Sequence, residues 1–169
     1  YATVPQTDYA YLIEWDEYYS PKALYYLLEK GLYVNSAFKP FSIETNEGVK
    51  DFGYGTLMIP VGRQEMNASL VHAYVEEAME LASMQAYAVE SGFSASGIDL
   101  GSGSFRTVEM PKAVMLIGGS ASSYEAGEIW YLLDSKIGMP ITKVMSSSAG
   151  RIDWTKYNVL VLASGNYSG

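Results

Sequence analysis

The sequence contains no cysteine and one histidine, His72, among 169 residues. Without a thiol the chain forms no disulfide, has no thiolate nucleophile and holds no zinc through sulfur. A single histidine removes most of the remaining metal and catalytic-triad chemistry. The composition therefore argues against an enzyme, and we expect no metal and no cofactor in this chain.

Positive charge is also scarce. The 11 Lys and Arg residues stand against 19 Asp and Glu, a formal net charge of −8. This balance repels a phosphate backbone, so nucleic acid is not expected as a partner. No apolar run approaches the ~20 residues of a membrane span. Hydrophobic residues make up 49% of the chain, enough to form the core of a globular domain.

Seven short runs of apolar, β-branched or aromatic residues predict strands. Several are continuously apolar rather than alternating, which is typical of strands covered on both faces in a parallel sheet. The predicted strands are 9–14, 33–38, 56–61, 86–89, 113–117, 141–145 and 158–163.

Three segments with helical spacing lie between these strands, at about 20–31, 67–84 and 124–137. The first opens with Ser20-Pro21, a cap residue followed by proline at the first helical position. Each carries one apolar stripe that needs a sheet to cover it. Strands that alternate with helices predict an α/β fold: a three-layer α/β/α sandwich with a mainly parallel, flavodoxin-like sheet.

The two ends of the chain are similar in sequence. Tyr19 to Leu28 align with Tyr124 to Leu133 at an offset of 105, which predicts two repeated βαβ units at about 9–61 and 113–163. The alternative is that any two βαβ units look alike. The Gly- and Ser-rich stretch 91–105 is interpreted as a surface excursion within one domain that covers residues 1–169.

Both ends are expected to lie within a longer polypeptide. The last predicted strand is followed only by SGNYSG, whereas such a strand is normally followed by a covering helix. We therefore expect an uncovered sheet face and a homodimer formed through it.

Candidate ligand residues follow two of the predicted strands. Glu14 and Asp16 come after the first, where open α/β sheets bind ligands and where carboxylates could hold a hard cation. Ser122 and Tyr124 belong to a Gly-Gly-Ser loop that opens a helix, which is either a plain capped turn or an anion site. The alternative for the acidic loop with Glu14 and Asp16 is a solvated surface loop. His72 is expected to be a solvated residue on the polar side of its helix.

The stretch Ala88-Val89-Glu90-Ser91-Gly92, after a strand and a long helix, resembles the nucleophile elbow of class I glutamine amidotransferases. Ala88, Val89, Ser91 and Gly92 match that elbow, but Glu90 stands where the family has its catalytic cysteine. The resemblance implies a degenerate elbow at Glu90, Ser91 and Gly92. It also places a strained Glu90 near Glu14 and Asp16, with no histidine in reach.

Four longer segments (YAYLIEWDEYYSPKALYYLLEKGL, DFGYGTLMIPV, SSYEAGEIWYLLDSKIGMPIT and YNVLVLASGNYS) resemble the amidotransferase-like accessory region of large bacterial zinc carboxypeptidases of the carboxypeptidase A type. These enzymes are usually exported, so the resemblance implies a periplasmic or secreted location. It also implies a non-catalytic role in domain packing or ligand binding. Zinc and peptide cleavage would then belong to the parent's own peptidase domain, which would be the partner of this chain.

Two other functions stay open at this point. The first is a small-molecule hydrolase or amidotransferase that uses Glu90 in place of the cysteine. Turnover of glutamine or a simple ester that disappears in Glu90→Ala would favour it. The second is a ligand-sensing domain with a crevice beside Glu14 and Glu90.

Overall fold

The computed structural model describes residues 3–167, which divide between Glu109 and Met110 into two compact units. The first unit, up to Glu109, has 6 Lys and Arg against 15 Asp and Glu, a net charge of −9. The second has 5 against 4, a net charge of +1. The acidity of the chain therefore belongs entirely to the first unit.

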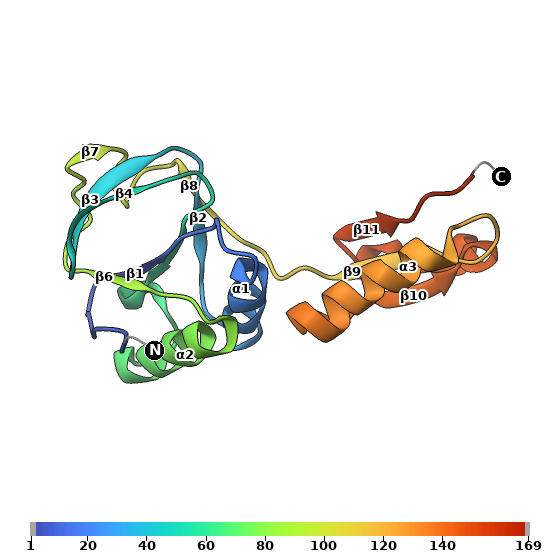
Figure 1. The fold of residues 1–169 in the computed structure, drawn as a ribbon, viewed down its shortest axis with the longest axis horizontal. Coiled ribbons are helices and arrows are strands. Elements are labelled where there is room, and N and C mark those ends of the chain that lie inside the picture. The colour runs from blue at the N-terminus through green and yellow to red at the C-terminus, as the bar shows by residue number, and fades with distance from the viewer. Residues whose placement is uncertain (1–2, 168–169) are drawn as a thin grey trace. The chain divides into compact units, whose positions relative to one another are not determined.

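The first unit contains two antiparallel sheets and two α-helices (Figure 1). The larger sheet has the order β6-β1-β5-β2-β8, and the smaller has the order β4-β3-β7. The strands are β1 (Ala10–Ile13), β2 (Asn35–Ala37), β3 (Phe41–Thr45), β4 (Gly48–Phe52), β5 (Leu57–Pro60), β6 (Tyr87–Val89), β7 (Ser96–Gly97) and β8 (Phe105–Thr107), and the helices are α1 (Ser20–Glu29) and α2 (Ala68–Ala82).

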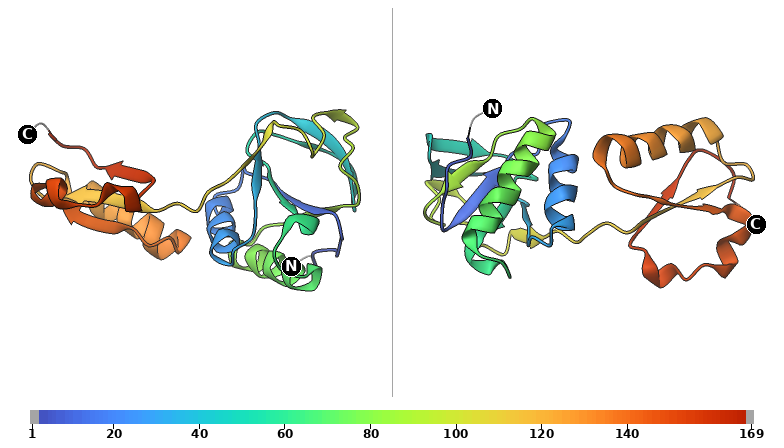
Figure 2. Two further views of the ribbon diagram at one scale, coloured as in Figure 1. Left: turned by 180° about the vertical axis from the view of Figure 1, so that it is seen from behind. Right: turned by 90° about the horizontal axis from the view of Figure 1, so that it is seen from below.

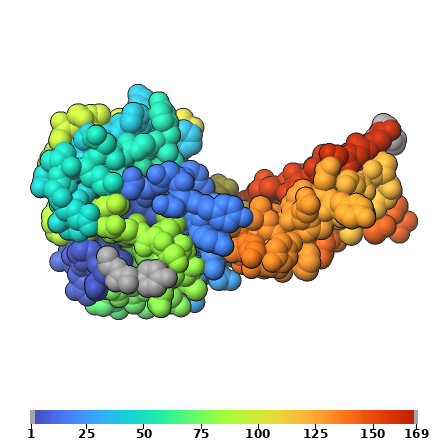
Figure 3. All heavy atoms as spheres, viewed as in Figure 1, coloured from blue at the N-terminus to red at the C-terminus, as the bar shows by residue number. Residues whose placement is uncertain are grey.

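These elements form three layers. Helices α1 and α2 lie side by side on one face of the larger sheet, as the right-hand view of Figure 2 shows, and bury Tyr11, Ile13 and Ile59 against it. The smaller sheet covers part of the opposite face, where Phe41, Ile43 and Phe52 pack against side chains of the larger sheet. The space-filling view shows the β3–β4 hairpin on one side of this unit and α2 on the other (Figure 3).

The predicted mainly parallel, flavodoxin-like sandwich is wrong. Every strand pair in the first unit is antiparallel. Strand β1 has no exposed residue because helices cover one face and a second sheet covers the other. A continuous apolar run reports burial on both faces, and here that burial arises without parallel pairing. Strands β5 and β6 flank β1, and α2 connects them.

The second unit is a three-stranded parallel sheet with the order β10-β9-β11. Its elements are β9 (Ala113–Ile117), α3 (Ser123–Trp130), a π-helical continuation (Tyr131–Ile137), β10 (Thr142–Met145), two short 3-10 helices (Ser146–Arg151 and Trp154–Lys156) and β11 (Val159–Leu162). The predicted apolar stripe of α3 packs on one sheet face, with Ala126 and Trp130 against Met115. Parallel pairing is thus confined to this small sheet.

The outer strand β11 is exposed although it consists of apolar residues. Leu160 and Leu162 are 50% and 48% exposed, and β11 pairs only with β9 in the described residues. The two segments of the predicted repeat also differ in topology, because β1 and β5 are antiparallel whereas β9 and β11 are parallel.

Candidate functional site

A pocket of about 420 Å³ lies in the first unit, on the part of the larger sheet that faces away from the helices. Its floor comes from three adjacent strands: Ala10 of β1, Met58 of β5 and Asn35 of β2. The other lining residues are Asp8, Tyr9, Tyr33, Pro60, Gly62, Arg63, Leu100, Gly101, Ser102 and Phe105. The pocket is therefore an apolar sheet surface rimmed by polar and charged side chains, the usual composition of a ligand site.

Asn35 is the polar residue of the floor. Because side chains alternate along a strand, its neighbour Val34 points into the helix-side core and Asn35 points to the opposite face. Asn35 is only 4% exposed, and no hydrogen bond reaches its side-chain amide from any residue between 3 and 167. In the described residues Tyr26 Oη is the fully buried side-chain polar atom without a partner, so the Asn35 amide is not sealed from solvent but opens onto the pocket that it lines. Its donor and acceptor are therefore available to water or to a ligand in the pocket.

Arg63 supplies a positive charge at the pocket wall. It ends the short 3-10 helix Val61–Arg63, and its guanidinium lies 4.5 Å from the ring centroid of Tyr33. The next residue, Gln64, fixes Tyr33 in turn: its side chain accepts from the Tyr33 N–H and donates to the Tyr33 carbonyl, both at 2.8 Å. The Tyr33 hydroxyl contacts Thr107 Oγ1 at 2.7 Å. The Tyr33 side chain next to the guanidinium is therefore fixed through its backbone and through its hydroxyl.

Asp8 places a negative charge in the same pocket. Its two neighbours are anchored, because the Thr7 hydroxyl donates to the Val89 carbonyl (2.7 Å) and accepts from the Tyr9 N–H (3.0 Å). The three ion pairs found in residues 3–167 involve neither Asp8 nor Arg63. Two opposite charges therefore line one pocket without forming an ion pair.

A buried tyrosine, Tyr11, is hydrogen-bonded to the segment that contains Asp8. The Tyr11 hydroxyl accepts from the Thr7 N–H (3.3 Å) and contacts His72 Nδ1 at 3.0 Å, while His72 Nε2 lies 3.6 Å from Glu76. Burial raises the pKa of Tyr11, and the Thr7 N–H opposes that rise. The prediction of a solvated His72 is wrong, because the ring turns toward β1 and joins this hydrogen-bond chain.

The predicted elbow residues line a neighbouring depression. Glu90, Ser91 and Gly92 follow β6, and the depression that they line shares Tyr9, Gly101 and Ser102 with the pocket described above. Glu90 is exposed, and Ser83 is the only non-glycine with a positive φ among residues 3–167, so Glu90 has no strained elbow geometry. Gly92 is constrained by packing: a Cβ there would lie 2.1 Å from the Tyr9 hydroxyl.

The predicted cluster of Glu14, Asp16 and Glu90 is not formed. Strands β1 and β6 are antiparallel with Ala10 opposite Val89, so Glu14 and Glu90 follow opposite ends of the strand pair. Five residues of extended chain separate these ends by ~17 Å. A parallel arrangement would have placed both at one edge, so this error follows from the wrong strand direction.

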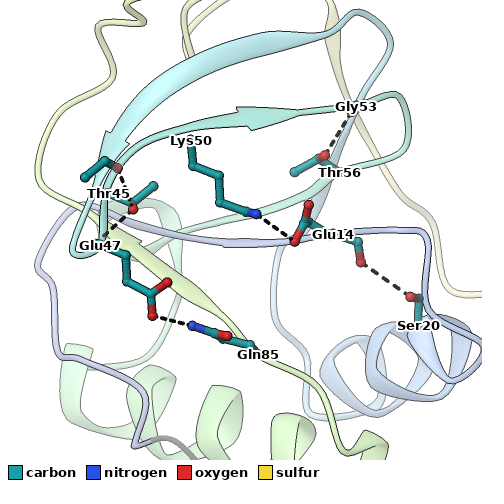
Figure 4. Close-up of polar contacts among 9 residues, drawn as sticks. Glu14, Ser20, Thr45, Glu47, Lys50, Gly53, Thr56 and Gln85 are labelled. Carbon is teal, nitrogen blue, oxygen red and sulfur yellow. Dashed lines mark hydrogen bonds and ion pairs between the residues drawn. The ribbon is translucent and has the colours of Figure 1, made fainter.

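Glu14 instead makes an ion pair. Its Oε2 lies 3.2 Å from Lys50 Nζ of β4, and its main-chain carbonyl accepts from Ser20 Oγ at 3.4 Å (Figure 4). The Lys50 ammonium also lies 4.7 Å from the ring centroid of Tyr87. Burial lowers the pKa of Lys50, but the Glu14 carboxylate and the Tyr87 hydroxyl outweigh it and leave that pKa raised. Asp16 is exposed and has no part in this contact.

Ser122 and Tyr124 belong to the second unit, whereas Glu14 and Asp16 belong to the first. Ser122 is the N-cap of α3: its Oγ accepts from the Glu125 N–H, and its own N–H donates to the Ser164 carbonyl. The Ser164 N–H donates to Glu125, which lowers the pKa of that carboxyl. Tyr124 is 86% exposed. This loop matches the plain capped turn that the sequence offered as one alternative.

Sequence reasoning missed Asp8, Asn35 and Arg63, the polar and charged residues on which the site is argued. A signal existed for Asn35, because an amide in the short strand run YVNSA is unusual where strand positions are mostly apolar. Asp8 and Arg63 lie 55 positions apart and flank strands, so no local spacing connects them. They line the same pocket because β1 and β5 pair with Ala10 opposite Pro60.

Two further properties concern the described part of the chain. No helix in residues 3–167 has the length and apolar character needed to cross a membrane. No group of three or more His, Cys, Asp or Glu side chains in that range is placed to hold a metal ion.

Comparisons of the chain with protein-family models, with curated proteins and with solved structures find no match. The resemblance to the accessory region of zinc carboxypeptidases therefore stays a prediction, and the function has to be argued from the pocket itself.

Proposed function

We propose that the chain is a non-catalytic binding module whose ligand site is the pocket around Asn35. The observation that carries this proposal is the Asn35 amide, which has no hydrogen-bond partner in the described residues and opens onto the floor of the pocket. A strand position that only had to fill space would be more stable with an apolar residue. An amide that opens onto the floor of a pocket is therefore explained by a ligand that it contacts.

The resemblance noted in the sequence supports a proposal that this module belongs to a larger protein. In this proposal the chain is an accessory domain of an exported zinc metallocarboxypeptidase, periplasmic or secreted, and the zinc is bound by the parent's catalytic domain. The exposed apolar strand β11 supports a second role in packing, against that peptidase domain or against a second copy of the chain.

Ligand binding is tested by NMR spectroscopy on the ¹⁵N-labelled chain. We expect the side-chain NH₂ signals of Asn35 to shift during titration with at least one small probe from a panel of L-leucine, benzoate, benzylamine and glucose. The backbone signals of Arg63 and Ser102, which line the same pocket, should shift with them.

The matched control is Asn35→Leu, which keeps the size of the side chain and removes its amide. This variant should lose the shifts at Arg63 and Ser102. If no probe moves the Asn35 signals at millimolar concentration, the binding proposal is wrong.

A further inference from the structure

The two unpaired charges in the pocket identify its ligand more closely. We propose that the pocket binds a small zwitterion with an apolar side chain, the chemistry of a free α-amino acid. This inference rests on the proposed binding function and specifies its ligand class.

Arg63 is suited to the carboxylate. The Arg63 guanidinium lies over the Tyr33 ring, 4.5 Å from its centroid, and its N–H groups remain available as donors, two of which a carboxylate can accept. The contacts of Gln64 and Thr107 with Tyr33 hold that ring, so the guanidinium needs little reorganisation when a ligand binds. No carboxylate of residues 3–167 lies within ion-pair distance of Arg63.

Asp8 is suited to the ammonium. It lines the same pocket, makes no ion pair in the described chain and lies between two anchored residues, Thr7 and Tyr9. A ligand with one charge of each sign would neutralise both groups at once. The amide of Asn35 both donates and accepts, so it can bond to either end of such a ligand.

The remaining surface is suited to an apolar side chain. Met58, Leu100 and Phe105 line the pocket and belong to the core on this face of the sheet. The volume of about 420 Å³ lies in the lower part of the ~300–1,000 Å³ range of small-molecule sites. A single amino acid such as leucine therefore fits its size and its polarity.

Charge distinguishes this ligand from a simple anion such as phosphate. The first unit has a net charge of −9, and the exposed Asp8 contributes one of these negative charges at the rim of the pocket. Both repel a ligand that is only negative, whereas a zwitterion has no net charge to be repelled.

The test measures the affinity of the full chain for three ligands of similar shape by calorimetry. They are L-leucine, 4-methylpentanoate, which lacks the ammonium, and 3-methylbutylamine, which lacks the carboxylate. We expect leucine to bind and each analogue to bind at least ~10-fold more weakly, the effect of losing one charge-assisted hydrogen bond.

Variants assign each charge to its residue. Arg63→Gln should weaken leucine binding at least ~10-fold and leave the affinity for 3-methylbutylamine unchanged. Asp8→Asn should weaken leucine binding and leave 4-methylpentanoate unchanged. Arg106→Gln and Asp16→Asn are the matched controls, because both residues lie in the first unit outside this pocket, and they should bind leucine like the wild type.

The outcomes separate this inference from the proposed function. If 4-methylpentanoate binds as tightly as leucine and shifts the Asn35 signals, the pocket binds ligands but the zwitterion inference is wrong. If benzoate, benzylamine or glucose shifts those signals and leucine does not, the inference is again wrong while the binding function stands. If no probe shifts them, both are wrong.

Discussion

Replacing Phe52 with alanine is expected to lower the free energy of unfolding of the first unit by ~3–5 kcal/mol. Phe52 is 2% exposed at the contact between the two sheets of this unit. Its ring stacks on Phe41 at 5.2 Å and meets Tyr87 edge-on at 5.6 Å. Truncation would leave a cavity between two rigid sheets that cannot collapse to fill it.

Urea unfolding followed through backbone NMR signals of residues 3–109 measures this effect. Val49→Ala is the control, because Val49 belongs to the same strand, β4, and is 61% exposed. It should change the free energy by no more than ~0.5 kcal/mol. A Phe52→Ala variant as stable as Val49→Ala would show that the smaller sheet does not pack on the larger one.

Replacing Gly97 with alanine is expected to cost at least ~2 kcal/mol and to weaken ligand binding. Gly97 has φ +84°, and a Cβ there would lie 2.5 Å from the Pro40 carbonyl oxygen and 2.7 Å from Phe41 Cα. Both neighbours are backbone atoms, so no side chain can rotate to make room. Gly97 pairs with Phe41 just before the segment that contributes Leu100 and Ser102 to the pocket.

Gly103→Ala is the control for this substitution. Gly103 lies in the same loop, has no positive φ, and a Cβ there would meet nothing within 4 Å. It should be nearly neutral in the same unfolding and calorimetric measurements. Equal stability of the two variants would contradict the described path of the loop.

The sequence predicted which segments become strands and helices better than how they pair. All seven predicted strands are present, and the predicted helical stripes face the cores, as Val71 and Val75 of α2 do. Strand direction was not predicted correctly, because continuous apolar runs such as that of β1 record burial on both faces and not the identity of the covering layers.

The β3–β4 hairpin was missed although its pattern was readable. Phe41, Ile43 and Thr45 are buried and alternate with less buried residues, which is the period of a half-buried strand. A turn at Asn46 and Glu47 then leads into Gly48. Both strands are short and mixed in polarity, so a prediction from apolar runs did not select them.

The pocket was beyond prediction for a different reason. It needs the pairing of β1 with β5, the pairing of β5 with β2 and the return of the Leu100–Phe105 segment over the same sheet face. The elbow at Glu90 was inferred from local sequence, but an elbow needs a parallel sheet and a strained backbone. In the structure β6 pairs antiparallel with β1, and Glu90 has no positive φ.

The most direct test of the account is the stability of Asn35→Leu with and without 10 mM L-leucine. If the Asn35 amide is kept for a ligand, the variant should be more stable than the wild type by ~1 kcal/mol without leucine. Leucine should then stabilise only the wild type. Asn46→Leu is the matched control: Asn46 Oδ1 accepts from the Ala88 N–H at 2.9 Å, so that variant should lose ~1–3 kcal/mol. An Asn35→Leu variant destabilised as strongly as Asn46→Leu would show that the Asn35 amide serves the fold, and would contradict the proposed site.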